Sequence, residues 1–390
     1  MKIVNQLRIL QFITPAGFYG AERWVLALAN NFASDSIVCD LAVTEEGPEQ
    51  DLSVAKYYPK QAGDVHYIPM KSRFDFGAVN QLVRIIKDRN IDIIHTHGYK
   101  SDILGIVAAK RAGIKCVSTP HGFAKNAGIK LALFIFFGNV MLRFFDAVVP
   151  LSDELMRDME RLKIPKRKTH FIRNGVDLRD IDETLNQIEK HQDSTTNTKD
   201  TKYIGFIGQL IPRKGIPDLI EVFDMLHASD KSLKLLLIGD GQQRQELESM
   251  VATKKSHANI EFLGFRQDRL ELLNQFDLFV MTSSLEGIPR CMMEAMAVGV
   301  PVVAYDIPGV DQLIEHEVTG LLAPLGDKEA LRAQCERILT NTELAEQLAK
   351  AARAKVDEKY SAARMAKEYV AIYEQLLGDG TLAVNRNNRG

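Results

Sequence analysis

Two carboxylates flank a helix start that the sequence predicts in its second half. Glu286 and Glu294 lie in the segment SSLEGIPRCMMEAMAVGVPVVA, residues 283–304. Pro289 suits the first turn of a helix and Gly299 suits the position after the last turn, so a helix is predicted between them. The first N–H groups of a helix have no partner within it, and with the positive end of the helix dipole they form a site for an anion.

The two carboxylates would accept hydrogen bonds from sugar or ribose hydroxyls of such a ligand. Glu286 lies just before the predicted helix and Glu294 one turn inside it, while Gly287 would let the backbone approach the ligand closely. The alternative is structural: Glu294 pairs with Arg290 one turn away, and Glu286 is only a favourable charge near a helix start. The segment alone leaves both interpretations open.

A second loop offers two cations. The segment GQLIPRKG, residues 208–215, follows a predicted strand at 203–207. Arg213 would bind a diphosphate in a fork, and Lys214 would act as a point charge. In a loop chosen at random, an arginine and a lysine would be expected to be solvated surface residues. The position of Arg213 and Lys214 at the end of a strand favours a role in binding instead.

Two further loops carry residues suited to a ligand. In TPHGF, residues 119–123, His121 follows a predicted strand, where a titratable donor would contact a phosphate or a sugar hydroxyl. A structural histidine with satisfied hydrogen bonds is the alternative. In FYGAER, residues 18–23, Gly20 would allow close approach of the backbone. This segment lacks the G-x-G-x-x-G spacing of dinucleotide-binding proteins, which makes a dehydrogenase the weakest hypothesis.

Two polar patterns are interpreted as structural. His95 and His97 in the sequence HTH suggest a metal site, but no third ligand is identifiable, so a packing or supporting role is favoured. Asp180 and Asp182 have the D-x-D spacing of metal-dependent sugar transferases of another fold. They do not follow a core strand, so no metal is predicted.

Alternating strands and helices must position these loops. This alternation is typical of βαβ units with a parallel sheet, in which ligands bind at the carboxyl ends of the strands. Residues 186–202 are almost wholly polar and read as a connection between two such halves. Strands are predicted at 8–14, 37–43, 64–68, 91–95, 115–119, 147–150, 169–172, 203–207, 233–238, 260–262, 278–282, 301–304 and 320–322. Helices are predicted at 21–32, 76–89, 101–112, 152–162, 289–298 and 355–377.

Composition narrows the class of protein. A chain of 390 residues is large enough for two domains, and its net charge of −2 gives no reason to expect a nucleic-acid partner. Four scattered cysteines are typical of a reduced, cytosolic protein, and the polar residues near the N-terminus argue against a signal peptide. The apolar, uncharged run 131–142 is too short to span a bilayer.

The segment 123–145 is unusually apolar, and Lys125, Lys130 and Arg143 lie close to its residues Phe134, Phe136, Phe137 and Phe144. One interpretation is an interfacial element that touches the inner membrane near a lipid-linked acceptor. A core helix that is apolar all round is the favoured alternative.

The four loops, in this order, resemble the retaining glycosyltransferases of family 4. The most specific element is the E-x7-E pattern from Glu286 to Glu294, and the segments IRNGVD, IGDG and FLGF are similar to family segments as well. The resemblance implies the GT-B fold, in which two Rossmann-like doubly wound α/β domains face each other across a cleft. It covers the chain from Gly20 to about Leu377.

The resemblance implies a role for each loop. Glu286 would contact the donor sugar and Glu294 the ribose, while Arg213 and Lys214 would neutralise the leaving diphosphate. His121 would lie near the reaction centre. The catalytic residues implied are His121, Arg213, Lys214 and Glu286, and the donor-binding residues are Gly20, Gly208, Arg213, Lys214, Gly241, Phe265, Arg266, Glu286, Gly287, Ile288, Pro289, Arg290 and Glu294.

Two positions depart from the family pattern. Gln209 stands where the family often has arginine, which places more of the phosphate binding on Arg213 and Lys214. Tyr19 and Gly20 stand where the family often has a glycine pair, which puts the approach of that loop to the ligand in doubt.

The sequence therefore predicts a cytoplasmic retaining glycosyltransferase that needs no cofactor. It would move a sugar from a nucleoside-diphosphate sugar to a saccharide or lipid-linked acceptor, in bacterial polysaccharide or lipopolysaccharide synthesis. A GT-B nucleotide-sugar epimerase and a non-catalytic nucleotide-sugar-binding protein are the alternatives. The expected divisions are an acceptor domain at 1–180, a connection at 181–202, a donor domain at 203–355, a helix at 356–377 that crosses back to the first domain, and a flexible tail at 378–390.

Overall fold

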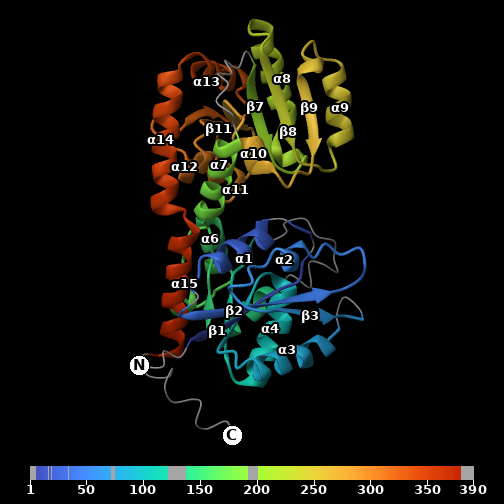
Figure 1. Ribbon diagram of the computed structural model, residues 1–390, viewed down its shortest axis with the longest axis vertical. Coiled ribbons are helices and arrows are strands. Elements are labelled where there is room, and N and C mark those ends of the chain that lie inside the picture. The colour runs from blue at the N-terminus through green and yellow to red at the C-terminus, as the bar shows by residue number, and fades with distance from the viewer. Residues whose placement is uncertain are drawn as a thin grey trace. The chain divides into compact units, whose positions relative to one another are not determined.

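The chain forms two compact units in a computed structural model that describes residues 6–378 except 16, 19, 34, 72–74, 122–137 and 192–200. Unit 1 comprises Met1–Asp177 with Ala362–Gly390, and unit 2 comprises Leu178–Ser361 (Figure 1). Within the described parts of the chain, no helix combines the length and apolarity needed to cross a membrane.

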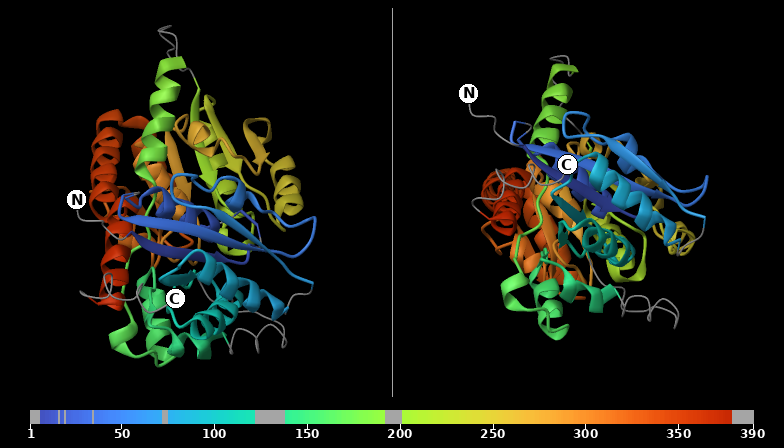
Figure 2. Two further views of the ribbon diagram at one scale, coloured as in Figure 1. Left: turned by 60° about the horizontal axis from the view of Figure 1, so that its bottom comes forward. Right: turned by 90° about the horizontal axis from the view of Figure 1, so that it is seen from below.

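Unit 1 is built on a six-stranded sheet in the order β3-β2-β1-β4-β5-β6, and its paired strands run parallel. The first strands of this sheet are the blue arrows in Figure 2. The neighbours of β1 are β2 on one side and β4 on the other, so the order reverses at β1/β4. The strands are β1 Leu7–Ile13, β2 Ile37–Glu45, β3 Val65–Pro69, β4 Ile93–Thr96, β5 Lys115–Ser118 and β6 Ala147–Val148. The helices are α1 Gly20–Asn30, α2 Ser53–Lys56, α3 Gly77–Asp88, α4 Tyr99–Ala112, α6 Asp153–Arg161 and α15 Ala362–Leu377, with short 3-10 helices at Leu142–Phe144 and Lys166–Lys168.

Alternating strand residues bury both faces of this sheet. Ile9 of β1 packs in one core with α1 and α15, whereas the next residue, Leu10, packs in a second core with α3 and α4. This period of two is what a parallel sheet covered on both faces requires. The doubly wound architecture predicted for this half is confirmed.

Unit 2 repeats the arrangement with the strand order β12-β11-β10-β7-β8-β9. Its order reverses between β7 and β10, which pair in parallel. The strands are β7 Lys202–Ile207, β8 Leu233–Ile238, β9 Ile260–Gly264, β10 Leu278–Met281, β11 Val302–Asp306 and β12 Leu321–Pro324. The helices are α7 Leu178–His191, α8 Ile216–Ser229, α9 Arg244–Ala252, α10 Arg269–Leu273, α11 Arg290–Val298, α12 Val310–Leu313, α13 Lys328–Thr340 and α14 Thr342–Lys359, with 3-10 helices η3 Pro212–Lys214 and η4 His257–Asn259.

Two predictions on the connecting segments are wrong. The polar connection predicted at 181–202 begins inside α7, because Leu178, Ile181, Leu185 and Ile188 form an apolar stripe at helical spacing that continues past residue 186. The single helix predicted at 355–377 is two helices, because Tyr360 leaves the helical conformation (φ −133°) after Lys359. The helix α14 belongs to unit 2, and α15 belongs to unit 1.

Two smaller differences concern unit 1. The predicted strand at 169–172 is only an isolated bridge between Val148 and Thr169. The apolar segment 123–145 lies largely outside the described residues. In its described end, Phe145 is fully buried in the core while Phe144 is exposed.

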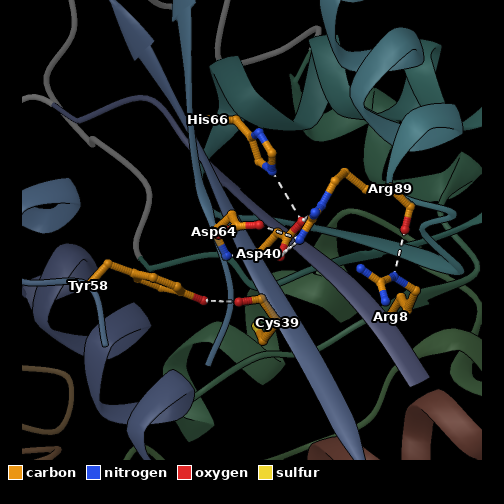
Figure 3. Close-up of polar contacts among 7 residues, drawn as sticks. All are labelled: Arg8, Cys39, Asp40, Tyr58, Asp64, His66 and Arg89. Atoms are coloured by element: carbon orange, nitrogen blue, oxygen red, sulfur yellow. Dashed lines mark hydrogen bonds and ion pairs between the residues drawn. The ribbon is translucent and has the colours of Figure 1, made fainter. Parts of the chain in front are cut away.

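A buried ion network stabilises unit 1 at the start of β3. Asp40 of β2 is fully buried, and its carboxylate accepts hydrogen bonds from Nε2 of His66 (3.1 Å) and Nε of Arg89 (2.8 Å) (Figure 3). Arg89 also pairs with the exposed Asp64 (2.5 Å). Burial by itself would raise the pKa of Asp40, but the hydrogen bonds from His66 and Arg89 hold it well below its ordinary value.

We expect Asp40→Asn to destabilise unit 1 by about 3 kcal/mol, since it removes one partner of a buried charge network. The stability from Asp40 is complete above its ordinary pKa of about 4 and is lost as the pH falls below it, because the folded pKa is the lower one. Urea unfolding followed by fluorescence of Trp24 measures this, because the single tryptophan of the chain lies in unit 1. Asp64→Asn is the control and should cost less than about 0.5 kcal/mol, because Asp64 is a surface partner. Equal losses in the two variants would refute the special role of Asp40.

Candidate functional site

The loops after β7 and β10 meet at the point where the strand order of unit 2 reverses. In doubly wound sheets this point holds the ligand-binding crevice. Gly215, at the end of the loop after β7, has φ +63°, and a Cβ there would lie 2.2 Å from the carbonyl oxygen of Thr282 after β10. Only glycine fits this position, so the two loops are held against each other by the backbone itself.

The charged residues of these two loops contact each other. Nζ of Lys214 lies 2.5 Å from Oε1 of Glu286, and both side chains are more than nine-tenths buried. Nη1 of Arg213 lies 3.3 Å from Oε2 of Glu286 and donates a hydrogen bond to the carbonyl of Leu285 (3.0 Å), while Arg213 itself remains 44% exposed. Two residues that the sequence separates by 72 positions thus form a buried ion pair with a second cation at its edge.

The helix α11 begins at Arg290, directly after this ion pair. Pro289, predicted in the first turn, instead precedes the helix in an extended conformation, whereas Gly299 follows the last turn with φ +90°, as predicted. A Cβ on Gly309, after β11, would lie 1.7 Å from the carbonyl oxygen of Gly287, so a third loop packs on the segment before α11. The helix start therefore lies among the loops after β7, β10 and β11.

Glu294 inside α11 is bound by two arginines. Its Oε1 accepts hydrogen bonds from Nη2 of Arg269 (3.0 Å) and Nε of Arg290 (3.0 Å), and its Oε2 accepts one from Nε of Arg269 (3.2 Å). The pairing of Arg290 with Glu294 that the sequence left open as an alternative is therefore present. Arg269, at the start of α10, was missed because no sequence spacing links it to Glu294.

Several buried polar atoms near these loops lack a hydrogen-bond partner among the described residues. They include Oγ of Ser283 after β10 and Nη1 of Arg290, and Oε1 of Gln243 after β8. Buried polar atoms are normally paired, so unsatisfied donors and acceptors beside a charged cluster are suited to a bound ligand.

The other donor-binding residues predicted in unit 2 follow β7, β8 and β9, at the same edge of the sheet. A Cβ on Gly241 would lie 2.4 Å from the carbonyl oxygen of Leu210, so the loop containing Gly208 contacts the loop after β8. Phe265 is 53% exposed after β9, and Arg266 forms an ion pair with Asp268. Gly287, Ile288 and Pro289 occupy the turn before α11.

Unit 1 carries a second polar cluster, also where its strand order reverses. His95 of β4 is fully buried, and its ring nitrogens bond the hydroxyls of Tyr373 and Thr119, each at 2.7 Å. His97 follows β4, and His121 follows β5, with His97 Nδ1 at 3.3 Å from His121 Nε2. Burial lowers the pKa of His121 to about 3 and the pKa values of His95 and His97 well below the ordinary value. All three rings are therefore neutral at physiological pH.

The structure also places Gly20 and the D-x-D pattern. Gly20 begins α1, and a Cβ there would meet no atom within 4 Å, so packing does not require glycine. Asp182 of the D-x-D pattern pairs in a fork with Arg353 (2.9 and 3.1 Å). Within the described residues, no three His, Cys, Asp or Glu side chains gather in a way that would hold a metal ion.

Two parallel doubly wound units, one of them with a charged site at its switch point, define the GT-B class of proteins. Comparison with known proteins gives the family. Residues 187–355 match the family described as Glycosyl transferases group 1, and residues 18–180 match Glycosyltransferase Family 4. The chain belongs to the group 1 glycosyltransferases of the family 4 type, and it is a transferase of the EC 2.4 class.

Two curated relatives and a solved structure match most of the chain. The chain is 26% identical over 315 residues to N-acetyl-alpha-D-glucosaminyl L-malate synthase of Bacillus anthracis, which covers 78% of this chain and 80% of that protein. It is 26% identical over 323 residues to UDP-Gal:alpha-D-GlcNAc-diphosphoundecaprenol alpha-1,3-galactosyltransferase of Escherichia coli, covering 79% and 81%. The fold matches Anabaena HepE in complex with UDP with a TM-score of 0.75 and 20% identity, covering 94% and 99%. The predicted family, two-unit α/β fold and enzyme class are confirmed.

Proposed function

We propose that this enzyme transfers a sugar from a nucleoside-diphosphate sugar to a hydroxyl of a saccharide or lipid-linked acceptor, with retention at the anomeric carbon. The observation that carries the proposal is the buried pair of Lys214 and Glu286 beside the start of α11. A cation, a carboxylate and a helix N-terminus at one switch point suit the diphosphate and the hydroxyls of a donor at the same time.

Each residue of the site has its own role in the proposed reaction. As the bond to the sugar breaks, negative charge grows on the leaving diphosphate, and Lys214, Arg213 and the N–H groups of α11 stabilise it. Glu286, held by Lys214, accepts hydrogen bonds from the donor sugar. No enzymic nucleophile is assigned, so the acceptor hydroxyl attacks on the face that the diphosphate leaves, and the leaving phosphate takes its proton. This scheme needs no metal ion.

The similar proteins support this choice of substrates. HepE has been crystallised with UDP-glucose, and the name of the Escherichia coli relative specifies a UDP-galactose donor and a lipid-linked diphosphate acceptor. A Staphylococcus aureus relative, 22% identical over 326 residues, is a capsular polysaccharide biosynthesis glycosyltransferase. We therefore propose a cytoplasmic role in bacterial cell-surface polysaccharide or lipopolysaccharide synthesis. Contact of residues 123–145 with the inner membrane stays a prediction.

A thermal-shift panel of UDP, GDP, ADP, CMP and their sugar conjugates tests the donor. We expect one nucleotide family to stabilise the protein, by about 2.7 kcal/mol at one hundred times its dissociation constant. The anomeric configuration of the product, measured by NMR from early time points, then tests retention. An inverted product would refute the proposed stereochemistry. Interconversion of sugars without acceptor would identify an epimerase instead.

A further inference from the structure

The loop after β10 also contacts the backbone of both cations in the loop after β7. Oγ1 of Thr282 donates a hydrogen bond to the carbonyl oxygen of Lys214 (3.0 Å). The N–H of Ser284 donates one to the carbonyl oxygen of Arg213 (2.8 Å), and its hydroxyl donates a second to the same oxygen (3.2 Å). Sequence spacing does not link Thr282 to Lys214, because 68 positions separate the two residues. These contacts lie entirely within unit 2.

The carbonyl of Lys214 needs a donor from outside its own loop. The helix α8 begins at Ile216, and the N–H of Asp218 in its first turn donates to the carbonyl of Gly215 (3.0 Å). Both Lys214 and Thr282 are buried, so water does not readily take the place of a missing donor. A buried carbonyl without a partner costs free energy. The hydroxyl of Thr282 therefore satisfies a group that lies just outside the hydrogen bonding of α8.

The segment from Thr282 to Glu286 binds Lys214 at both ends. Thr282 fixes its backbone carbonyl, and Oε1 of Glu286 lies 2.5 Å from its ammonium nitrogen. The stem of a lysine is flexible, so its charged end takes many positions when only one end of the residue is held. Because both ends are bound to one segment, the ammonium group has a defined position beside the start of α11.

We propose that Thr282 is a positioning residue for the reaction: its hydroxyl holds the backbone of Lys214, and thereby holds the ammonium group where negative charge grows on the leaving diphosphate. The inference rests on the proposed function for the identity of that ligand. A misplaced charge weakens the transition state more than the bound donor, because the diphosphate carries more charge as its bond to the sugar breaks. Loss of the hydroxyl should therefore lower kcat more than it raises KM.

The contact itself can be tested without any substrate. Acetic anhydride acetylates lysine amines, and peptide mass spectrometry of the full-length protein follows the rate at each site. We expect the buried Lys214 to react more slowly than the exposed Lys231, and its rate to rise by up to about tenfold in Thr282→Val, the value of one lost hydrogen bond. An unchanged rate would overturn the role of Thr282 whether or not the enzyme turns over, which separates this result from a failure of the proposed function.

Kinetic variants test the effect on the reaction. Thr282→Val keeps the shape of the side chain but removes the hydroxyl, and it should lower kcat about tenfold with little change in KM for the donor. Thr282→Ser keeps the hydroxyl and should restore the wild-type rate. Thr319→Val is the matched control, because Thr319 is buried in the same unit and its hydroxyl donates to the carbonyl of Leu313 (3.3 Å), before β12. Equal losses in the two valine variants would contradict a positioning role.

A double-mutant cycle decides whether the hydroxyl acts through the lysine. If it does, Thr282→Val combined with Lys214→Ala turns over as fast as Lys214→Ala alone, since no ammonium group remains to be positioned. A further loss of about tenfold in the double variant would mean that Thr282 supports the site by another route, and it would overturn the proposal. Thr282→Ala replaces the valine variant in each experiment if valine prevents folding.

Discussion

Lys214→Ala should lower kcat/KM by at least about two orders of magnitude. Lys214 is the buried cation at the switch point, and the proposed transition state places new negative charge on the diphosphate beside it. Among the described residues, the substitution also leaves Glu286 with only the half-exposed Arg213 as an ionic partner, and the uncompensated carboxylate would oppose the approach of a second anion. Steady-state kinetics with the selected donor measure the effect.

Two control variants separate the charge of Lys214 from general effects. Lys231→Ala removes an exposed cation before β8, at the opposite edge of the sheet of unit 2, and should leave the rate unchanged. Arg213→Ala should lower kcat/KM about tenfold, because Arg213 is 44% exposed and its charge is partly screened. Turnover of Lys214→Ala near the wild-type value would remove Lys214 from the catalytic site.

Glu294→Gln should weaken nucleotide binding by about tenfold to a hundredfold and lower the stability of unit 2 by about 3 kcal/mol. Burial would lower the pKa of Arg269, but the charge of Glu294 raises it above its ordinary value. The neutral amide would leave both Arg269 and Arg290 without their anion in a buried site. Denaturation and calorimetric titration with UDP measure the two effects.

The comparison of a nucleotide with its 2′-deoxy form decides whether Glu294 also contacts ribose. If it does, the wild-type protein prefers UDP to 2′-deoxy-UDP, and Glu294→Gln loses that preference. If Glu294 only anchors the two arginines, both nucleotides weaken by the same factor. Glu248→Gln is the control, since Glu248 forms a comparable pair with Arg244 (2.8 Å) on the surface of the same unit.

The sequence predicted those parts of the site that lie within one loop or one helix. The helix start at Pro289, its end at Gly299 and the position of Arg213 and Lys214 after a strand follow from local rules of capping and strand order. The helix α7 was not predicted, because the polar residues after 186 obscured an apolar stripe that begins at Leu178. The break at Tyr360 was also missed, since both flanking segments favour helix.

Contacts between loops required the tertiary structure. Arg269 reaches Glu294 from another helix, and His121 reaches His97 from the loop after another strand, and neither contact has a characteristic spacing in the sequence. Each is made because a doubly wound sheet brings the carboxyl ends of separate strands to one edge.

The sequence by itself determined the family, the class of fold and the identity of the charged groups. These follow from motifs and from the periodicity of strands and helices, which depend on residues close together in the chain. Only the tertiary structure decided which of those groups are neutralised by one another. The contact between His97 and His121 also depends on it, because both are set by burial and by distances between segments far apart in the chain.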